Sequence, residues 1–562
     1  MSEAPAVVVV SGHMIDAPDR KEPRFPPSQV ERVSREIDEA FDAWGVGPGT
    51  TILCGGARGA DILAAEAGLR RGAAVYVCLA LPPDEFERCS VVLPGSDWAT
   101  RFRSLLERAE VEVAAGSNDT RADGADVFER ANARLVDLAT SRTDRPYAAL
   151  VWDGKRGDGP GGTADLVRRL GFSGPDPRAC VIDPTPREYE ERQLSPGPKR
   201  MLALDGGGIR GALTLEILGA IENQLRARRG DPDLVLSDYF DYIGGTSTGA
   251  IIAAALALGK PVSEVRERYE KLGRKVFQRR FLPMRLRSFY RDGPLTEELE
   301  NLFGRGATLG DPKLRSLLLL VLHNTVTDSL WPVSNCTRAR YNRADRYLNA
   351  KPDRNLDLPL STLVRGSTAA PIYFPPQRIQ LGSREFLFQD GGITPFNNPA
   401  LLLFLMATLP EYGVAWPVGE SNLLVVSVGT GAAAGVHPGL SSRRVGLLFN
   451  ASNLPAVFMR GSSVGQDMVC RSLARARAGA TIDREFGSRL NGLSPAGANL
   501  FTYLRYDADL SEEALADFGI TSARERERLR KLDAVDAIPQ LQALGRSVAQ
   551  QIDHDRDFAG FE

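Results

Sequence analysis

The stretch DYIGGTSTGAIIAAALA, residues 241–257, places a serine between glycines in the pattern G-x-S-x-G. The strand-like run FDYIGG precedes Ser247, and the small, apolar residues after it favour a helix. A turn this sharp between strand and helix needs small residues on both sides, which Gly245 and Gly249 provide. Such a turn would lift the Ser247 hydroxyl above a helix N-terminus, so we interpret this serine as a nucleophile.

The pattern alone does not decide the matter, because GSSVG at residues 461–465 fits it as well. That segment follows LPAVFMR, which is not clearly a strand, and an arginine-rich helical stretch follows it. We therefore interpret Ser463 as an ordinary helix-capping serine. The nucleophile is expected at Ser247.

The composition limits which kinds of protein this chain can be. Its 562 residues correspond to about three domains at about 100–200 residues each. The net charge of −2 argues against a dedicated nucleic-acid binder. The six cysteines form no C-x-x-C pair, so we expect neither a metal site nor a disulfide framework, and free thiols suit the cytoplasm. We also expect no signal peptide and no membrane-spanning segment.

The pattern of strands and helices predicts an α/β protein with four parts. Residues 1–185 alternate strands and helices, which predicts a Rossmann-like domain with a parallel sheet. The charged, proline-rich residues 186–199 are expected to be a linker. A second α/β domain is expected over residues 200–436. Residues 437–562 predict a mainly helical extension that packs on it, with one strand-like piece in NLFTYLRYDADL.

A glycine-rich loop in LALDGGGIRG offers a site for an oxyanion. The N–H groups of a loop between strand and helix point into an anion-binding cradle. Residues 206–211 also fit the dinucleotide pattern G-x-G-x-x-G, but the acidic residue expected about 20 residues later is missing. The residues expected at the oxyanion hole are Gly206, Gly207, Gly208, Arg210 and Gly211.

A nucleophilic serine also needs a base, which is most often a histidine. His323 follows LLLLVL, and we interpret it as a strand-end residue with a satisfied hydrogen bond. Asp390 comes directly after the strand-like REFLFQ and is followed by Gly391 and Gly392, so it could reach the crevice at the strand ends. A lone D-G-G is most often a plain turn. Only its company with the other two motifs favours Asp390 as the base.

DGGGIRG, GTSTG and DGG, in this order, resemble the patatin-like phospholipase family over about residues 200–435. RGSTAAPIYFPP at residues 365–376 and SVGTG at residues 427–431 resemble it too. The resemblance implies a lipid acyl hydrolase with a Ser–Asp dyad, in which Ser247 is the nucleophile and Asp390 the general base. It implies neither a metal nor a cofactor.

A basic segment in the second domain suits a lipid enzyme. Residues 271–291, KLGRKVFQRRFLPMRLRSFYR, carry eight basic residues and no acidic one, interleaved with aromatic and aliphatic residues. Such segments bind anionic lipid surfaces, although an amphipathic helix with solvated arginines explains the pattern equally well. A phospholipid membrane surface, reached from the cytoplasm at its inner face, is therefore an expected partner.

Two glycine-rich loops in the first domain follow strands, within LCGGARGAD and after VWDG. Open α/β sheets bind ligands at the carboxyl ends of their strands, and SGH at residues 11–13 would lie there as well. A phosphate cradle is expected, with tight turns that bind nothing as the alternative. The expected ligand-binding residues are Gly12, His13, Gly55, Gly56, Arg58, Gly59, Gly161, Gly162 and Thr163.

This first domain resembles the SLOG superfamily of Rossmann-like domains, related to DNA-processing and lysine-decarboxylase-like (LOG) proteins. Enzymes of that family carry P-G-G-x-G-T-x-x-E, whereas residues 160–165 lack the inner glycine and the glutamate. The resemblance therefore implies that the domain senses a nucleotide second messenger rather than hydrolysing it. A sensor joined to a patatin-like domain resembles antiphage effectors that degrade the host membrane.

Two other functions remain open. A non-catalytic nucleotide-binding or scaffold protein is one, although the intact Ser247 and Asp390 argue against it. A nucleotide phosphoribohydrolase activity of the first domain is the other, and the broken P-G-G motif argues against that. A homo-oligomer is compatible with the sequence.

Overall fold

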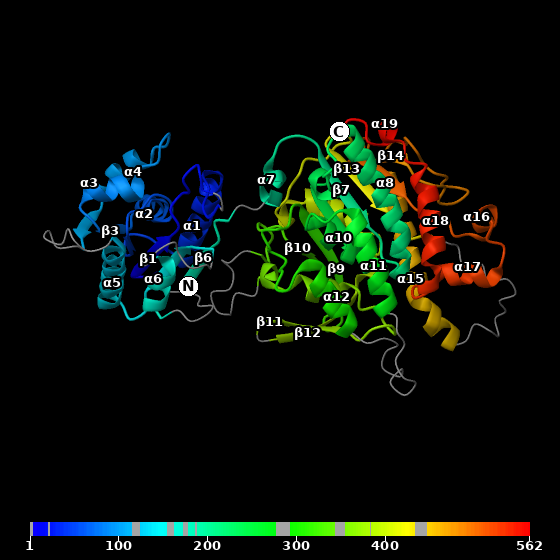
Figure 1. Ribbon diagram of the computed structural model, residues 1–562, viewed down its shortest axis with the longest axis horizontal. Coiled ribbons are helices and arrows are strands. Elements are labelled where there is room, and N and C mark those ends of the chain that lie inside the picture. The colour runs from blue at the N-terminus through cyan, green and yellow to red at the C-terminus, as the bar shows by residue number, and fades with distance from the viewer. Residues whose placement is uncertain are drawn as a thin grey trace. The chain divides into compact units, whose positions relative to one another are not determined.

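The computed structural model describes residues 4–20, 23–114, 124–153, 162–171, 178–185, 188–276, 293–342, 354–382, 384–432 and 447–562. The chain divides into two compact units, Met1–Pro186 and a second unit that includes Arg187–Arg343 and Arg354–Glu562 (Figure 1). Within the described ranges, no helix is both long and apolar enough to cross a membrane. The predicted α/β class is confirmed, because each unit is built around a sheet with helices packed against it.

The first unit contains a six-stranded sheet in the order β4-β3-β2-β1-β5-β6, and every strand pair in it is parallel. Its strands are β1 (Val7–Gly12), β2 (Thr51–Cys54), β3 (Ala74–Leu79), β4 (Glu110–Val113), β5 (Tyr147–Val151) and β6 (Ala179–Ile182). The strand order reverses between β1 and β5, and ligands of open α/β sheets bind at such a switch point.

Alternate side chains of β1 supply two separate cores in this first unit. Val8 and Val10 pack with α1 (Val30–Trp44) and α2 (Ala60–Arg70), whereas Val7 and Val9 pack with residues of α5 (Gly124–Arg142) and α6 (Thr163–Arg169). A continuous apolar strand covered on both faces therefore explains the run AVVVV.

The second unit contains a mixed sheet of nine strands, with β10 attached to β9 and the others in the order β11-β12-β9-β8-β7-β13-β15-β14. Its strands are β7 (Lys199–Leu204), β8 (Tyr242–Thr246), β9 (Leu317–Asn324), β10 (Ser329–Ser334), β11 (Gln377–Leu381), β12 (Arg384–Asp390), β13 (Leu423–Val428), β14 (Arg475–Ala478) and β15 (Thr502–Tyr506). The strands from β9 to β14 along this path run parallel, and β10, β11 and β12 add antiparallel pairs.

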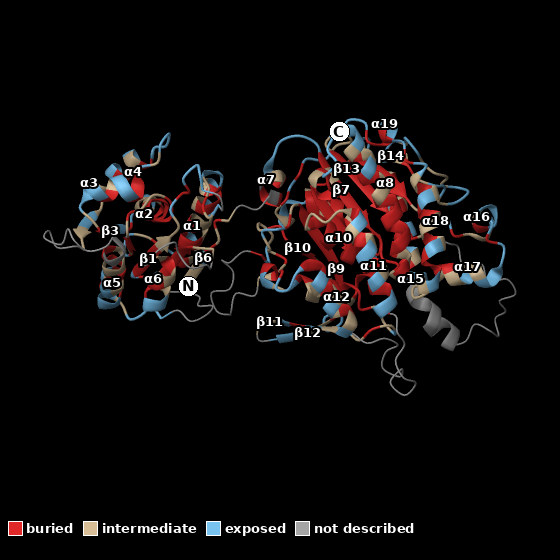
Figure 2. Cartoon of the chain, in the orientation of Figure 1, coloured by how far each residue is buried: buried red, intermediate tan, exposed pale blue. Residues whose placement is uncertain are grey.

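Helix α10 (Thr248–Ala257) is buried along its whole length, which explains its composition of alanine, isoleucine and leucine. Figure 2 shows it within the buried centre of the second unit. Helix α8 (Gly211–Arg229) packs on α11 (Val262–Val276) and on α18 (Ile538–Ala549). The C-terminal α18 is thereby part of the same hydrophobic core as the sheet.

The C-terminal region contributes more strand than its sequence predicts. The strand-like piece in NLFTYLRYDADL is β15, which pairs with β13. Helix α15 (Leu447–Leu473) ends before RARA, which we expected to be helical and which forms β14 instead. Ala476 and Ala478 are buried there between more exposed arginines, and this two-residue period is typical of a strand rather than a helix.

Part of the expected linker is structured as well. Helix α7 (Glu188–Leu194) packs within the second unit, where Arg192 forms an ion pair of 3.0 Å with Asp241 and the Trp416 indole donates a hydrogen bond to the Gln193 carbonyl. The absence of an apolar period concealed this helix, of which Tyr189 joins the hydrophobic core.

Candidate active site

The turn around Ser247 is tighter than most residues allow. Ser247 lies between β8 and α10 with φ 54° and ψ −122°, a conformation that is strained for a residue with a side chain. A Cβ atom on Gly245 would collide with the carbonyl oxygen of Gly249, and one on Gly249 would collide with that of Leu204. The two glycines that flank the serine are therefore required by close backbone contacts.

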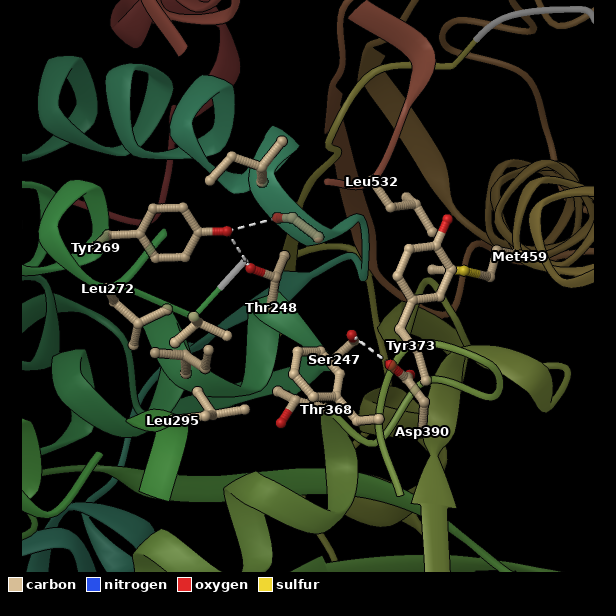
Figure 3. Close-up of a pocket in the computed structure, with 16 residues that line it drawn as sticks. Ser247, Thr248, Tyr269, Leu272, Leu295, Thr368, Tyr373, Asp390, Met459 and Leu532 are labelled. Carbon is tan, nitrogen blue, oxygen red and sulfur yellow. Dashed lines mark hydrogen bonds between the residues drawn. The ribbon is translucent and has the colours of Figure 1, made fainter. Parts of the chain in front are cut away.

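Ser247 and Asp390 meet where the oppositely directed strands β8 and β12 end on the two sides of β9, beside Val321 and Leu322 (Figure 3). The Ser247 hydroxyl donates a hydrogen bond of 2.6 Å to Oδ2 of Asp390, while Oδ1 accepts one of 2.7 Å from the N–H group of Gly392. The N–H group of Ser247 donates to the hydroxyl of Ser367 at 3.0 Å. Both members of the pair are thus fixed from a second side.

Burial makes Asp390 a stronger base than an exposed aspartate. The residue is 1% exposed, and this desolvation raises the pKa of its carboxyl group to about 6, against the opposing hydrogen bonds from Ser247 and Gly392 and the charge of Arg365. The carboxyl group is still mostly ionised at neutral pH. It can therefore accept a proton from Ser247 there.

The glycine loop lies between β7 and the short 3-10 helix Gly208–Arg210. A side chain on Gly206, Gly207 or Gly208 would collide with Asn397, Thr430 or Leu532, respectively. Gly208 also has φ 57°, the left-handed region that favours glycine. Three successive glycines are thus explained by close packing on every side.

The N–H groups of this loop differ in what they bind. That of Gly206 donates to the carbonyl oxygen of Asn397 at 3.1 Å, and that of Ile209 donates to the carbonyl oxygen of Leu532 at 2.8 Å. Within the described part of the chain, the N–H groups of Gly207 and Gly208 donate no hydrogen bond, which leaves them available to an oxyanion.

Arg210 and Gly211, which we expected at the oxyanion hole, have supporting contacts instead. The Arg210 guanidinium donates to the carbonyl oxygens of Gly431 at 3.1 Å and Gly207 at 3.3 Å. Gly211 leaves space for the Tyr269 hydroxyl, which would be 2.7 Å from a Cβ atom at that position. Tyr269 in turn donates to the Gly208 carbonyl oxygen at 2.5 Å.

A small apolar cavity of about 60 Å³ opens beside Ser247 and Asp390 (Figure 3). Its walls include Leu272, Leu295 and Tyr373, and the C-terminal region adds Met459 and Leu532. No sequence pattern pointed to Met459 or Leu532, because both reach the cavity from segments more than 200 residues after Ser247.

The alternative candidates for the base and for the nucleophile, His323 and Ser463, do not contact Ser247. The imidazole of His323 on β9 bonds to the Asp328 carboxylate at 3.1 Å, as expected for a strand-end histidine. Ser463 lies inside α15, so its interpretation as a helix cap is wrong. Its hydroxyl instead donates to Asp205 at 3.0 Å and accepts from the Asn397 amide at 2.9 Å.

The first unit has a larger cleft, of about 690 Å³, at the carboxyl ends of its strands. Gly56 and Gly59 do not line it; a Cβ atom on Gly56 would be 2.9 Å from Val77, and one on Gly59 would be 2.9 Å from the His13 carbonyl oxygen. Gly161 lies outside the described residues. The cleft is lined by the expected residues Gly12, His13, Gly55, Arg58, Gly162 and Thr163.

The side chain of Asp61 binds one N–H group of the glycine loop at which we expected a phosphate cradle. Its buried carboxylate accepts the N–H group of Ala57 at 3.1 Å, so this donor is not open to a ligand. Burial raises the pKa of Asp61 to about 7. Sequence alone could not reveal which acceptor the loop would bind.

The cleft instead presents a cluster of charged side chains that sequence reasoning missed in part. Asp153, two residues after the end of β5, accepts hydrogen bonds from Arg24 at 2.8 and 3.0 Å and lies 3.0 Å from the His13 ring. Arg58 lines the cleft and donates to the Ile15 carbonyl oxygen at 3.0 Å. Asp153 lies within VWDG at the end of a predicted strand, a position that could have pointed to it, whereas nothing local pointed to Arg24.

The basic segment 271–291 lies mostly outside the described residues. Its described beginning completes α11, where Lys271 forms an exposed ion pair of 2.6 Å with Glu267, and Lys275 forms one of 2.5 Å with the half-buried Glu298. Exposed pairs of this kind contribute little stability. Among the described residues, no group of three or more histidine, cysteine or acidic side chains could hold a metal ion.

Comparison with known proteins identifies the class of the second unit. Residues 202–404 match the family described as "Patatin-like phospholipase". "Patatin-like protein 1" of Arabidopsis thaliana is 30% identical over 41% of this chain and 58% of its own length. The chain is also similar to two proteins named "cGAMP-activated phospholipase". The protein of Vibrio cholerae is 27% identical over 61% of this chain and 99% of its own length. The protein of Escherichia coli is 28% identical over 44% of this chain and 66% of its own length.

Residues 202–404 thus form a patatin-like phospholipase domain. The chain spans less than two thirds of the Arabidopsis and Escherichia coli relatives. Conversely, the Vibrio cholerae relative leaves more than a third of this chain without a counterpart.

The raised pKa of Asp390 predicts a pH-dependent gain in stability for Asp390→Asn. The native pKa of about 6 exceeds the ordinary value of 3.8, so the ionised carboxylate destabilises the folded state as pH rises through this window. Asparagine stays neutral. We expect the variant to be more stable than wild type at pH 8, by about 2–3 kcal/mol, and nearly equal to it at pH 4.

Thermal or chemical unfolding at the two pH values measures this difference. Asp517→Asn, which changes an exposed aspartate at the end of α16 (Glu512–Asp517), is the matched control and should show no such gain. A stability difference for Asp390→Asn that is the same at pH 4 and pH 8 would contradict the account.

Proposed function

We propose that this protein hydrolyses acyl esters of phospholipids, with Ser247 as nucleophile and Asp390 as general base. The observation that carries the proposal is the hydrogen bond of 2.6 Å between them at a strained strand-to-helix turn. Asp390 accepts the hydroxyl proton while Oγ of Ser247 attacks the ester carbonyl carbon. The N–H groups of Gly207 and Gly208 stabilise the resulting oxyanion.

The remaining steps use the same two residues. As the tetrahedral intermediate collapses, its bond to the alcohol oxygen breaks, and that oxygen takes the proton from Asp390. The acyl group stays on Ser247. Asp390 then accepts a proton from a water molecule that attacks the acyl-enzyme, and its return to Oγ of Ser247 releases the fatty acid. The apolar walls of the cavity favour an acyl chain beside the reacting ester.

The proposed substrate surface is a phospholipid membrane, contacted at the rim of the cavity from the cytoplasm. Ile372, next to Tyr373 of the cavity wall, is 42% exposed and has φ 74°, which is unusual for a β-branched residue. Phe458, next to Met459 of that wall, is 59% exposed. Exposed apolar side chains beside a lipid-binding cavity favour contact with acyl chains at the membrane interface.

We further propose that a nucleotide-like ligand in the cleft of the first unit raises the hydrolase activity. The cleft combines arginines with the aromatic residues Trp152, Phe86 and Phe128, which suits a phosphate joined to a base. The names of two relatives describe phospholipases activated by cGAMP. A lipase that attacks the cell's own membrane on such a signal would suit an antiphage effector.

The dyad predicts distinct effects of three substitutions on phospholipid hydrolysis. Ser247→Ala removes the nucleophile and should abolish turnover. Asp390→Asn keeps the shape but not the basicity, and should slow turnover by about 10²–10⁴. In the wild type, the rate should rise with pH through about 6, where the base becomes deprotonated. Ser463→Ala should lower turnover far less than Ser247→Ala, because Ser463 bonds to Asp205 and Asn397 and does not touch the reacting atoms.

Fatty-acid release from phospholipid vesicles, followed across pH 4.5–8.5 (a range chosen to bracket the expected limb), measures these effects. Near-normal turnover of Asp390→Asn, with the fold intact, would point to a different base, of which His323 is the first to test. An active Ser247→Ala would refute the assignment altogether.

The lipid-contacting rim predicts a substrate-dependent effect of Phe458→Ser. Hydrolysis of vesicle phospholipid should fall several-fold, because the variant loses exposed apolar surface. Hydrolysis of a water-soluble short-chain ester should not change. Leu493→Ser is the matched control, since Leu493 is 77% exposed but does not line the cavity. Equal losses on both substrates, or equal losses for both variants, would argue against a rim-specific role.

The nucleotide cleft predicts low basal activity that increases with ligand, because a ligand can activate only by binding better to the active state. Arg58→Ala should weaken this activation and leave the unstimulated rate unchanged. Arg70→Ala is the control and should not weaken the activation. Arg70 ends α2, and its guanidinium group pairs with Asp38 and does not line the cleft. The measurement is vesicle hydrolysis with cyclic and linear nucleotides. Full activity of the wild type, with no nucleotide bound in calorimetry, would contradict the proposal.

A further inference from the structure

A buried ion pair lies directly behind the glycine loop. Asp205, the residue before Gly206, is 2% exposed, and Arg505 on β15 is 6% exposed. Both guanidinium Nη atoms donate to the carboxylate, each at 2.8 Å. This planar, two-bond geometry fixes the direction of the Asp205 side chain as well as its distance.

Arg505 also connects Asp205 to the next two strands of the sheet. It donates to the Ser427 hydroxyl on β13 at 2.7 Å and to the Asp507 carboxylate at 2.7 Å. Asp507 in turn accepts the N–H group of Gly431 at 2.7 Å. The ends of β7, β13 and β15 are therefore held together by one guanidinium group.

Helix α15 completes this network from the opposite side. The Ser463 hydroxyl donates to Asp205 at 3.0 Å and accepts from the Asn397 side-chain amide at 2.9 Å. The hydroxyl of the neighbouring Ser462 accepts the backbone N–H group of Asn397 at 2.9 Å. The carbonyl oxygen of Asn397 accepts the N–H group of Gly206 at 3.1 Å. The first glycine of the loop is therefore fixed by its own bond to Asn397 and by the bonds of the preceding Asp205.

We propose that Asp205, Arg505 and Ser463 are positioning residues that aim the N–H groups of Gly207 and Gly208 at the oxygen of the reacting carbonyl. This inference rests on the proposed hydrolase function. Residues 202–404 match the family, so two of the three positioning residues come from the chain beyond that match. The C-terminal region is then part of the catalytic apparatus and not only a cover for the sheet.

Electrostatics supports this role over simple stabilisation. A buried ion pair gains little net stability, because removing both charges from water offsets their attraction. The carboxylate of Asp205, however, is attached to the loop where the oxyanion would form. Without Arg505, its negative charge would oppose the developing oxyanion, and the loop would lose its fixed direction.

The chain contains a matched pair for a control. Arg471 on α15 is 1% exposed and donates to both oxygens of Asp467, at 2.9 and 2.8 Å. Its other bonds go to the carbonyl oxygens of Ala480 and Ser488, and none goes to the glycine loop. Arg471→Gln therefore removes an equally buried arginine–aspartate pair of the same unit without touching the loop.

The experiment compares Arg505→Gln with Arg471→Gln in the full-length protein, measuring Tm, kcat and KM with a water-soluble short-chain ester. We expect Arg505→Gln to lower kcat at least tenfold, towards the factor of about 10²–10³ known for loss of an oxyanion donor, with little change in KM. Arg471→Gln should keep kcat within about threefold of wild type, because loss of an ion pair away from the loop removes no oxyanion interaction. Arg505→Lys, which keeps the charge, should restore part of kcat.

Equal losses of kcat in the two glutamine variants at equal losses of Tm would overturn the inference, since the network would then only stabilise the fold. A wild-type kcat in Arg505→Gln would overturn it as well, while leaving the proposed hydrolase intact. If Arg505→Gln does not fold, Arg505→Lys and Ser463→Ala distinguish a positioning role from a purely stabilising one. A positioning role predicts that each lowers kcat without lowering Tm in proportion. A wild-type protein that hydrolyses no ester would refute the proposed function and this inference together.

Discussion

The hydrogen bond between Ser247 and Asp390 is possible only because β8 and β12, which run in opposite directions, end level with each other on the two sides of β9. These two strands do not pair with each other, since β9 lies between them. The strained turn at Ser247 therefore has to direct the hydroxyl group across β9 to reach Asp390. The glycines that flank it and the fully buried helix α10 follow from this one geometric demand.

The same demand explains which parts of the site the sequence predicted. Sharp turns exclude Cβ atoms, so they leave glycines in the sequence, and all three motifs of the candidate site contain them. Ser247, Asp390 and the loop at Gly207 could be found because each carries a local steric signature. The structure brings all three together at strand ends, in agreement with the expected crevice.

Contacts between distant segments left no such signature. Ser463 bonds to Asp205 across 258 residues, and Arg505 bonds to it across 300. In the first unit, the glycine loop was recognisable, but nothing local showed that the carboxylate of Asp61 accepts the N–H group of Ala57. A pattern can indicate that N–H groups converge. It cannot say which buried acceptor satisfies them, because that depends on tertiary packing.

The hydrogen bond to the buried Asp390 carboxylate is what makes Ser247 a nucleophile in the proposed mechanism. Covalent labelling of the serine tests this most directly. A fluorophosphonate ester reacts with an activated serine hydroxyl, and peptide mass spectrometry locates the adduct. The account predicts one adduct, on Ser247, that disappears in Ser247→Ala and forms much more slowly in Asp390→Asn. An adduct on Ser463, or equally fast labelling of Ser247 in wild type and Asp390→Asn, would contradict it.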